Sequence, residues 1–317
     1  MKIVFLDSIS IGNDISLEGI KKEGELRTYN ITDEKEVYSR IKDAEIIITN
    51  KVYVGKKEME SSEKLKLICV AATGYNNVDI EEAKRRNIVV ANVKDYSTES
   101  VAQTVFAYIL EFQNKINKYN NDVKKGEWEK SPIFTMLNHT TFELKNKKIG
   151  IIGYGKIGKR VSEIAKVFGM EILVAKRKGV EYKESFRYSF EEVLKESDML
   201  TIHTPLTKES LNMIGKKELE LMKKDSILIN TARGGIVNEE ELYWALKNNE
   251  LRGAGLDVME EEPPKMHKKL FELDNIIITP HIAWASKESR EKLMAGIIEN
   301  IRDYKKGEIE KINIWRK

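Results

Sequence analysis

A chain of 317 residues with 41% hydrophobic and 33% charged residues has the composition of a folded protein of two ordinary domains, which excludes a disordered chain. Its 54 basic and 51 acidic residues give a formal net charge of +3, which excludes a general field for binding nucleic acid or a membrane surface. The single cysteine, Cys69, excludes an intramolecular disulfide. The start of the chain is charged too early for a signal peptide, and no apolar run approaches the roughly 20 residues of a membrane span. We therefore expect a cytoplasmic protein, and we expect no metal site.

The first 95 residues alternate short apolar runs with polar stretches of helical pattern. Glu34–Ile41 and Ile80–Arg86 have the pattern of helices. Such alternation predicts a parallel sheet with right-handed crossovers. The expected strands are Ile3–Leu6, Leu26–Tyr29, Ala44–Thr49, Leu65–Ala71 and Ile88–Val93.

A loop that contains Thr73, Gly74 and Tyr75 follows the fourth of these strands. In open parallel sheets ligands bind at the carboxyl ends of strands, so this loop could offer N–H groups to an anionic substrate. An ordinary turn rich in Gly and Asn is the alternative, and the loop by itself does not decide between them.

A long helix is expected after Ser97, a candidate N-cap. Its apolar residues lie on more than one face, which indicates burial between layers or between subunits. A loop around Trp128 follows, and a second set of strands begins at Lys148, where the residue pattern alone places the main domain change. The apolar residues of the long helix are Val101, Val105, Phe106, Ile109, Leu110, Phe112 and Ile116.

The apolar strand Ile149–Ile152 leads directly into Gly153-x-Gly155-x-x-Gly158 and then into an amphipathic helix. In this context the glycines are typical of a dinucleotide-binding turn. Gly153 permits the tight turn, Gly155 lets the backbone approach a pyrophosphate, and Gly158 lets helix and strand pack closely. The diphosphate would lie at the helix N-terminus, where free N–H groups favour an anion.

The next strand, Glu171–Ala175, ends at Lys176, Arg177 and Lys178. An NAD site usually has an Asp or Glu about 20 residues past the glycines, where it binds the ribose 2′-hydroxyl. Here that place holds cations, which would suit a 2′-phosphate. Surface charge at a strand end is the alternative.

Four further strands are expected, and polar groups follow three of them. Arg233 comes after the second, Asp257 lies in the third with Glu262 just beyond, and His281 follows the fourth. Reduction of a 2-oxo acid needs a cation for the carboxylate, which Arg supplies in two-pronged fashion, and a proton donor for the ketone oxygen, which His supplies near neutral pH. A carboxylate beside the His would stabilise its charged form. The strands are Asp198–His203, Ser226–Thr231, Gly253–Val258 and Ile276–Thr279.

These segments together resemble the D-isomer-specific 2-hydroxyacid dehydrogenase family over nearly the whole chain. The resemblance implies that Arg233 binds the substrate, that Glu262 tunes the histidine, and that His281 is the acid–base group. It also implies substrate contacts from Thr73, Gly74, Tyr75, Arg233 and Trp284. The implied coenzyme contacts are Thr104, Gly153, Gly155, Lys156, Ile157, Gly158, Lys176, Arg177, Thr204, Pro205, Ala232 and Asp257. The matching motifs are Gly153–Gly158, Ile229–Gly234, Gly255–Val258 through Glu262-Pro263, and Thr279–Ala283.

The family fold implies an α/β protein with two doubly wound parallel-sheet domains. Residues 1–96 and 285–317 would form a flavodoxin-like substrate domain, and residues 97–284 a Rossmann coenzyme domain. The boundary thus moves from Lys148 to the long helix, and the last helix, Lys287–Lys306, returns to the first domain. The resemblance also implies a homodimer formed through the long helix.

Within the family three segments resemble most the glycerate dehydrogenases, which reduce hydroxypyruvate. They are Tyr75–Asn77, Ser131–Phe134 and His281–Trp284. Glyoxylate, 3-phosphoglycerate and D-lactate remain alternative substrates, although the 36 residues after His281 are too few for the regulatory domain of many 3-phosphoglycerate enzymes. A formate dehydrogenase would have Gln in place of Glu262. The family usually has an acid at the position of Lys176. The lysine here favours NADPH over NADH as the coenzyme, although both forms of NAD(P)H fit the family. A non-catalytic, NAD(H)-sensing corepressor is the alternative of a different class.

Overall fold

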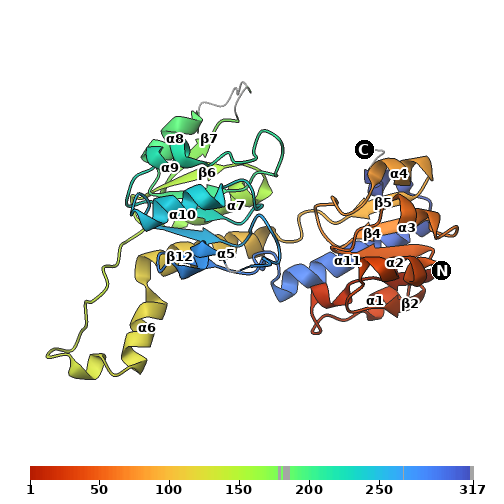
Figure 1. Ribbon diagram of the computed structural model, residues 1–317, viewed down its shortest axis with the longest axis horizontal. Helices are drawn as coiled ribbons and strands as arrows, with labels where there is room; N and C mark the ends of the chain where they lie inside the picture. The colour runs from red at the N-terminus through yellow and green to blue at the C-terminus, as the bar shows by residue number, and fades with distance from the viewer. Residues whose placement is uncertain (178–179, 181–185, 267, 315–317) are drawn as a thin grey trace. The chain divides into compact units, whose positions relative to one another are not determined.

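The computed structural model describes residues 1–177, 180, 186–266 and 268–314. The chain divides into two compact units, coloured continuously along the sequence in Figure 1. Unit 1 comprises Met1–Ser97 and Ala285–Lys317, and unit 2 comprises Thr98–Trp284. The domain change that the residue pattern alone placed at Lys148 is therefore wrong. The reason is that the long helix α5 (Thr98–Asn114) packs on α7 (Lys156–Val167) and β10 (Ile227–Asn230) of unit 2.

Unit 1 is built on a parallel sheet of five strands in its described residues, in the order β2-β1-β3-β4-β5. This order is that of flavodoxin-like folds. Two of the three inner strands, β3 and β4, are buried at every position, which is typical of a parallel sheet covered on both faces. Three of them, β3, β4 and β5, lie within the predicted runs, and β1 and β2 each begin and end one residue earlier than predicted. The strands are β1 Lys2–Phe5, β2 Glu25–Thr28, β3 Ile46–Thr49, β4 Leu67–Val70 and β5 Val89–Asn92.

Helices cover both faces of this sheet. Val4, Ile47 and Ile68 pack with the apolar residues of α2, α3 and α4, while α11 contacts β4. The predicted helices over Glu34–Ile41 and Ile80–Arg86 are present, and α1 and α3 are short helices that the sequence did not predict. The helical segments of the unit are η1 Ser8–Ile11, α1 Glu18–Lys21, α2 Glu34–Ile41, α3 Lys56–Glu60, α4 Ile80–Arg85, α11 Lys287–Lys305 and α12 Ile309–Ile312.

Unit 2 contains a parallel sheet with seven strands among its described residues, in the order β12-β11-β10-β9-β6-β7-β8. From β6 the chain adds strands β7 and β8 on one side and then β9 to β12 on the other, so the switch point of a Rossmann fold lies between β6 and β9. The short edge strand β8 was not predicted. The strands are β6 Lys148–Ile152, β7 Glu171–Ala175, β8 Arg187–Tyr188, β9 Met199–Ile202, β10 Ile227–Asn230, β11 Gly253–Leu256 and β12 Ile276–Ile278.

Successive residues of the central strands face two different helix layers. Leu200 and Leu228 pack with residues of α8, α9 and α10. Met199 and Ile227, each one position earlier, pack instead with α5 and α7. The period-2 alternation of a strand thus gives one core on each face, which makes the unit doubly wound. The helical segments in addition to α5 and α7 are α6 Ile116–Lys124, η2 Trp128–Lys130, α8 Phe190–Glu196, α9 Lys216–Leu221, α10 Glu239–Lys247 and η3 Lys269–Glu272.

An arm, residues 115–140, leaves the body of unit 2 where α5 ends. Lys115 has a φ of 51°, so the chain turns there and α6 begins as a new helix. Figure 1 shows α6 and the following segment extending away from the sheet. Ile116, expected on the buried long helix, lies instead in the arm and is 61% exposed. A short 3-10 helix replaces the expected loop at Trp128.

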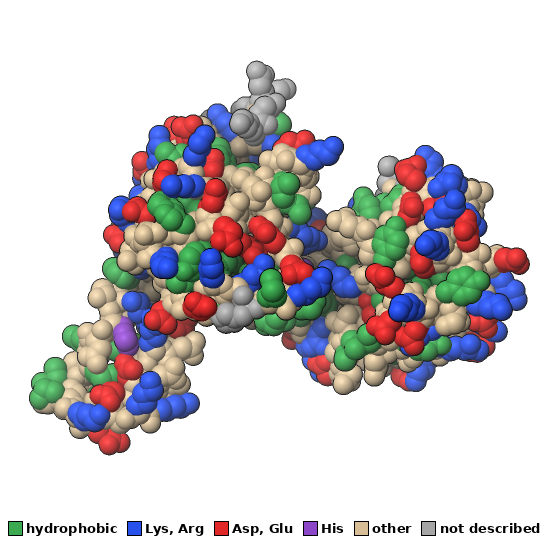
Figure 2. All heavy atoms as spheres, viewed as in Figure 1, with side chains coloured by type: hydrophobic (Ala, Val, Ile, Leu, Met, Phe, Trp, Pro, Cys, Tyr) green, Lys and Arg blue, Asp and Glu red, His purple; other side chains and the backbone are tan. Residues whose placement is uncertain are grey.

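The surface carries charges of both signs without large fields of one sign, as Figure 2 shows for one face. In the part of the chain that the structure describes, no helix has the length and apolar character needed to cross a membrane.

Candidate active site

Two of the three glycines in the Gly153–Gly158 turn are required by close backbone contacts, and the third leaves the turn open to a ligand. Gly153 has a φ of 92°, and a Cβ there would lie 2.5 Å from the carbonyl oxygen of His203. A Cβ on Gly158 would lie 2.2 Å from the carbonyl oxygen of Gly153. Gly155, the N-cap of the 12-residue helix α7, has open space within 4 Å of its Cβ position. The backbone is therefore accessible at a helix N-terminus, and these residues fit a diphosphate.

The neighbouring residues that were expected to contact the coenzyme lie at two adjacent strand ends. Lys156 and Ile157 begin α7, and Thr204 and Pro205 follow β9. The end of β9 is tied to the end of β6, because the backbone N–H of His203 donates to Ile152 O at 2.7 Å. The turn and the loop after β9 thus lie side by side.

Lys176 and Arg177 are exposed at the end of β7. The Lys176 N–H donates to Tyr188 O at 2.9 Å, which extends the pairing with β8. The charges of these two residues contribute to lower pKa values of two nearby carboxylates. Hydrogen bonds from Ser189, then the charge of Lys176, hold the pKa of Glu192 below its usual value. A hydrogen bond from Thr207, followed by weaker effects that include the charge of Arg177, lowers the pKa of Glu209. Lys178, the third cation of the expected cluster, lies outside the described residues.

An aromatic and guanidinium cluster beside the glycine turn was not predicted. The guanidinium of Arg187 lies 5.6 Å from the ring of Tyr154 and 5.4 Å from that of Phe186. The Tyr154 hydroxyl is 3.1 Å from Ser162 Oγ on α7. Only the pairing of β7 with β8 brings Arg187 to the turn, so no local pattern could have indicated it.

His281 and Glu262 form a direct pair. Nδ1 of His281 lies 2.6 Å from Oε2 of Glu262, and the two side chains are 25% and 31% exposed. The other carboxylate oxygen of Glu262 accepts a hydrogen bond from the Met259 N–H at 3.0 Å. A carboxylate on Nδ1 orients the ring, so Nε2 is the nitrogen left to exchange a proton with a substrate.

Asp257, expected as a coenzyme contact, is 2% exposed and holds the segment that carries His281. Its carboxylate accepts hydrogen bonds from the N–H groups of Ile282 and Ala283, both at 2.8 Å, and from Thr279 Oγ1 at 2.5 Å. Burial raises the pKa of Asp257, and these hydrogen bonds lower it. Thr279 also meets the hydroxyl of Tyr108 on α5 at 2.5 Å. The sequence did not single out Thr279 or Tyr108 as residues of this cluster.

Arg233 is exposed in the loop after β10, and its Nη1 donates to the adjacent Ala232 O at 2.7 Å. Asn230 shapes this loop by accepting from the Ala232 N–H and donating to Arg233 O. A Cβ on Gly234 would lie 1.8 Å from Met259 O, so only glycine allows the loop to pack there. Since Glu262 binds the N–H of Met259, the Arg233 loop and the His281–Glu262 pair share a support.

The remaining predicted residues lie in different places. Thr104 is on α5, where its hydroxyl donates to Ser100 O at 3.0 Å. Trp284 ends unit 2, whereas Thr73, Gly74 and Tyr75 belong to unit 1. The structure brings Glu262, Asp257 and His281 together within unit 2; the joint contribution of the unit 1 loop stays a prediction.

Two further features are the buried His203, which follows β9, and a cavity at the opposite edge of the sheet. Burial lowers the pKa of His203 to about 3, so its ring is neutral, and its Nε2 is 3.0 Å from Thr201 Oγ1. A cavity of about 650 Å³ lies at the amino ends of β10, β11 and β12. Two of its cations already have partners, Lys224 with Glu250 and Arg252 with Gln113. It is separate from the strand ends that carry His281.

The chain was compared with protein families and known proteins. Residues 106–283 match the family model described as D-isomer specific 2-hydroxyacid dehydrogenase, NAD binding domain. A hydroxypyruvate reductase of Blautia hydrogenotrophica is 38% identical over 314 residues, which cover 97% of this chain and 98% of the relative.

Solved structures are similar over nearly the full length. An acyclic imino acid reductase (Bsp5) in complex with NADPH and D-Arg has a TM-score of 0.84 and 30% identity, covering 99% of each chain. D-Lactate dehydrogenase from Aquifex aeolicus, complexed with NAD and lactic acid, has a TM-score of 0.81 and 31% identity, covering 98% of this chain and 97% of that one.

Proposed function

Since the chain belongs to the D-isomer-specific 2-hydroxyacid dehydrogenase family, we propose that it reduces hydroxypyruvate to glycerate, with glyoxylate as a second substrate. The class is that of nicotinamide-dependent oxidoreductases acting on small 2-hydroxy and 2-oxo acids. The observation that carries the proposal is the 2.6 Å contact between His281 Nδ1 and Glu262 Oε2, an acid–base pair held at the carboxyl edge of the coenzyme sheet.

The bound nicotinamide would supply a hydride to the keto carbon of the substrate. His281 gives its Nε2 proton to the ketone oxygen, which completes the hydroxyl group. Glu262 keeps Nδ1 occupied and so holds the ring with Nε2 free for the transfer. Arg233 turns from the carbonyl of Ala232 to the substrate carboxylate, which accepts two parallel N–H bonds from the guanidinium.

The test is a turnover assay with hydroxypyruvate, glyoxylate, pyruvate and 3-phosphohydroxypyruvate, each with saturating NADH and NADPH. We expect the highest kcat/KM with hydroxypyruvate. A higher value with pyruvate or with the phosphorylated acid would contradict the proposed substrate and leave the reaction class in place.

For the coenzyme we propose a preference for NADPH over NADH. The support is the position of Lys176 and Arg177, exposed immediately after β7, where an acid would repel a 2′-phosphate. Glu192 and Glu209 lie within reach of these charges and reduce the gain. The similar imino acid reductase structure contains NADPH, and the similar D-lactate dehydrogenase contains NAD.

We also propose a homodimer in which the arm of unit 2 takes part with α5. The arm bears Ile133, Phe134 and Leu137, which are 61%, 89% and 81% exposed. Figure 2 shows hydrophobic side chains on it. The arm has its own ties, since His139 Nε2 lies 2.8 Å from Asp122 and the Tyr119 hydroxyl donates to His139 O at 2.6 Å. An ordered arm with exposed apolar side chains is typical of an interface.

Light scattering after gel filtration tests the dimer. We expect a mass of twice 36.5 kDa for the wild type and a shift toward monomer when Phe134 and Leu137 are both replaced by Ser. Val167→Ser, which changes a residue that is 88% exposed on α7, is the matched surface control. A monomeric wild type would refute the proposal.

A further inference from the structure

Two loops of unit 1 lie at the carboxyl edge of its sheet and are joined to each other by hydrogen bonds. The first loop (residues 50–55) follows β3, and the second loop (residues 71–79) follows β4 and contains Thr73–Tyr75. A parallel bridge pairs Val54 with Val78, with backbone hydrogen bonds from Val54 N to Asn77 O at 2.8 Å and from Asp79 N to Val54 O at 3.1 Å.

Side chains add two more links between the loops. Asn50, which is 6% exposed, donates through Nδ2 to Ala71 O at 2.9 Å. Asn77 donates through Nδ2 to Val52 O at 3.1 Å. Displacement of the first loop would therefore also displace the second loop.

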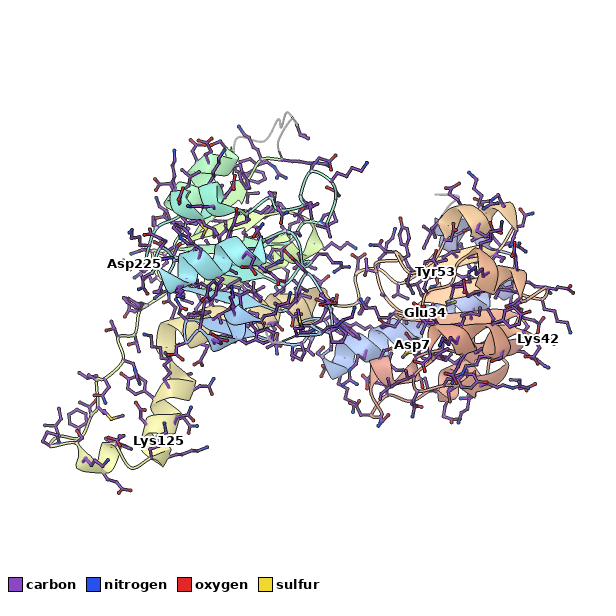
Figure 3. All side chains as sticks on the ribbon, viewed as in Figure 1. Asp7, Glu34, Lys42, Tyr53, Lys125 and Asp225 are labelled. Atoms are coloured by element: carbon purple, nitrogen blue, oxygen red, sulfur yellow. The ribbon has the colours of Figure 1, made fainter. Side chains whose placement is uncertain are left out.

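The first loop is fastened to the sheet by one buried carboxylate. Asp7, which follows β1 and is 8% exposed, accepts backbone hydrogen bonds from Asn50 at 2.9 Å, Lys51 at 2.7 Å and Val52 at 3.4 Å. Burial raises the pKa of Asp7, and these N–H groups lower it. In Figure 3, Asp7 and Tyr53 lie at one end of the unit and Lys42, before β3, at the other.

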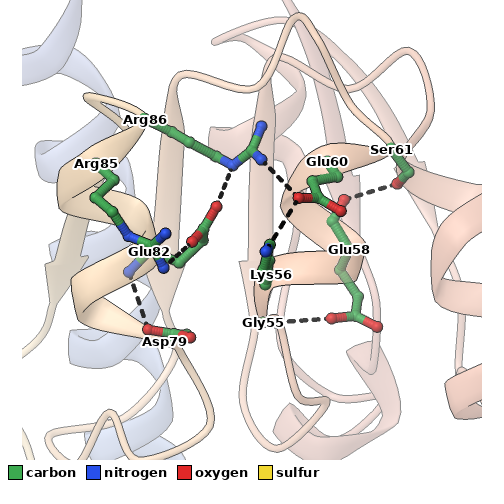
Figure 4. A network of polar contacts seen from close by, with 9 residues as sticks. All are labelled: Gly55, Lys56, Glu58, Glu60, Ser61, Asp79, Glu82, Arg85 and Arg86. Carbon is green, nitrogen blue, oxygen red and sulfur yellow. Dashed lines mark hydrogen bonds and ion pairs between the residues drawn. The ribbon is translucent and has the colours of Figure 1, made fainter.

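The far sides of both loops are held by helices. Gly55 ends the first loop and donates to Glu58 of α3 at 2.9 Å, while Asp79 ends the second loop and caps α4 by accepting from Glu82 N at 2.9 Å. Arg86 joins the two helices, since it binds Glu82 at 2.5 Å and Glu60 at 3.1 Å (Figure 4). The helices thus fix the ends of the two loops at Gly55 and Asp79, and Asp7 fixes the start of the first loop at residues 50–52.

We propose that Asp7 is a positioning residue for the substrate: its carboxylate fixes the first loop and, through the bridge at Val54 and Val78, the backbone of Thr73–Tyr75. This inference rests on the proposed function and on the substrate contacts that the family resemblance implies for Thr73–Tyr75, whose N–H groups would bind the carboxylate of the 2-oxo acid together with Arg233. A rigid loop is needed there because a bound carboxylate is held well only when its N–H donors are already in place.

The test is Asp7→Asn in the full-length enzyme. Asparagine has nearly the same shape, but it carries no negative charge and its NH₂ group cannot accept. The bond from the Asn50 N–H to Oδ1 is therefore lost, and the three N–H groups depend on one neutral amide oxygen in place of a carboxylate. We expect the KM for hydroxypyruvate to rise about tenfold, the size of one lost hydrogen bond to a charged group. The kcat and the dissociation constant of the coenzyme, measured by nucleotide fluorescence, should stay within about twofold, because coenzyme residues lie in unit 2.

Ser62→Ala is the matched control. Ser62 is 3% exposed and donates to Ala44 O at 3.1 Å at the amino edge of the same sheet, so its loss weakens the fold without reaching the loops. An equal rise of KM in this control would overturn the inference, as would an unchanged KM in Asp7→Asn. Where Asp7→Asn does not fold, Asn50→Ala removes one link of the same path and should also raise KM.

The failure of the proposed substrate gives a different result. If the wild type turns over glyoxylate and not hydroxypyruvate, the substrate assignment is wrong, and the same KM comparison is made with glyoxylate. If Tyr75→Ala and Asp7→Asn both leave KM unchanged for every accepted acid, the loop itself does not bind substrate, and the inference falls with it. A raised KM in Tyr75→Ala with an unchanged KM in Asp7→Asn overturns the positioning role alone.

Discussion

Two strand ends of the sheet in unit 2 differ in how their polar side chains are held. After β12, His281 pairs with Glu262 at 2.6 Å, and the buried Asp257 binds two N–H groups of the same segment. After β7, Lys176 and Arg177 are exposed to solvent. The first region is preorganised and needs no rearrangement during proton transfer, whereas the second acts through screened charges. Loss of His281 should therefore have a large effect, and loss of the exposed cations a smaller one.

The largest effect is expected from His281→Ala. Removing the proton donor should reduce the kcat for the 2-oxo acid by about 10²–10⁴-fold, the usual size of general acid–base contributions. Steady-state kinetics measure the loss, and the coenzyme dissociation constant serves as the control, because the glycine turn is unchanged. Turnover at the wild-type rate would show that another group supplies the proton.

Arg233→Lys should have the second largest effect. The charge remains, but the planar fork that fits a carboxylate is lost, so KM should rise by about tenfold to a hundredfold. Arg160→Lys, a change at an exposed surface ion pair on α7, is the matched control and should leave KM unchanged. A KM within about twofold of wild type in Arg233→Lys would mean that the carboxylate is held elsewhere.

The double variant Lys176→Glu, Arg177→Ala tests the exposed strand end. We expect the ratio of kcat/KM for NADPH to that for NADH to fall by about tenfold, and by less at high salt, since screened surface charges contribute little each. Lys166→Glu, near the other end of α7, controls for a general change of charge. A wild type that prefers NADH at both low and high salt would contradict the coenzyme preference.

The smallest effect is expected from Glu262→Gln. The amide keeps a contact with the ring, but it has one acceptor oxygen where the carboxylate has two, so it cannot accept from both the Met259 N–H and the ring N–H. The ring is then held less firmly, and kcat should fall by about threefold, the lower range for one lost hydrogen bond. Steady-state kinetics measure the loss. A kcat equal to that of the wild type would refute the role of Glu262.

Strands and motifs were predictable because their signals are local. The apolar run before Gly153 predicted β6, and the strand expected at Glu171–Ala175 is β7 with the same ends. The arm was less predictable. An apolar residue such as Ile116 fits the period of the long helix, but the left-handed backbone at Lys115 ends that helix before it.

The candidate site divides in the same way. Arg233, Glu262 and His281 were named from motifs at strand ends and from the family resemblance. The environment of Asp257 was not, because its burial depends on the N–H groups of Ile282 and Ala283, 25 and 26 residues away. Asp7 carries no motif at all, and its three N–H partners lie 43 to 45 residues further along the chain.

By itself the sequence determined the α/β class, the dinucleotide turn and the family, because glycine sterics and the alternation of apolar residues act within a few positions of the chain. The tertiary structure decided where the long helix ends, how Asp257 holds the segment of His281, and what holds the loops of unit 1. These outcomes depend on contacts between residues far apart in sequence, whose free energy arises only when strand pairing buries both partners together.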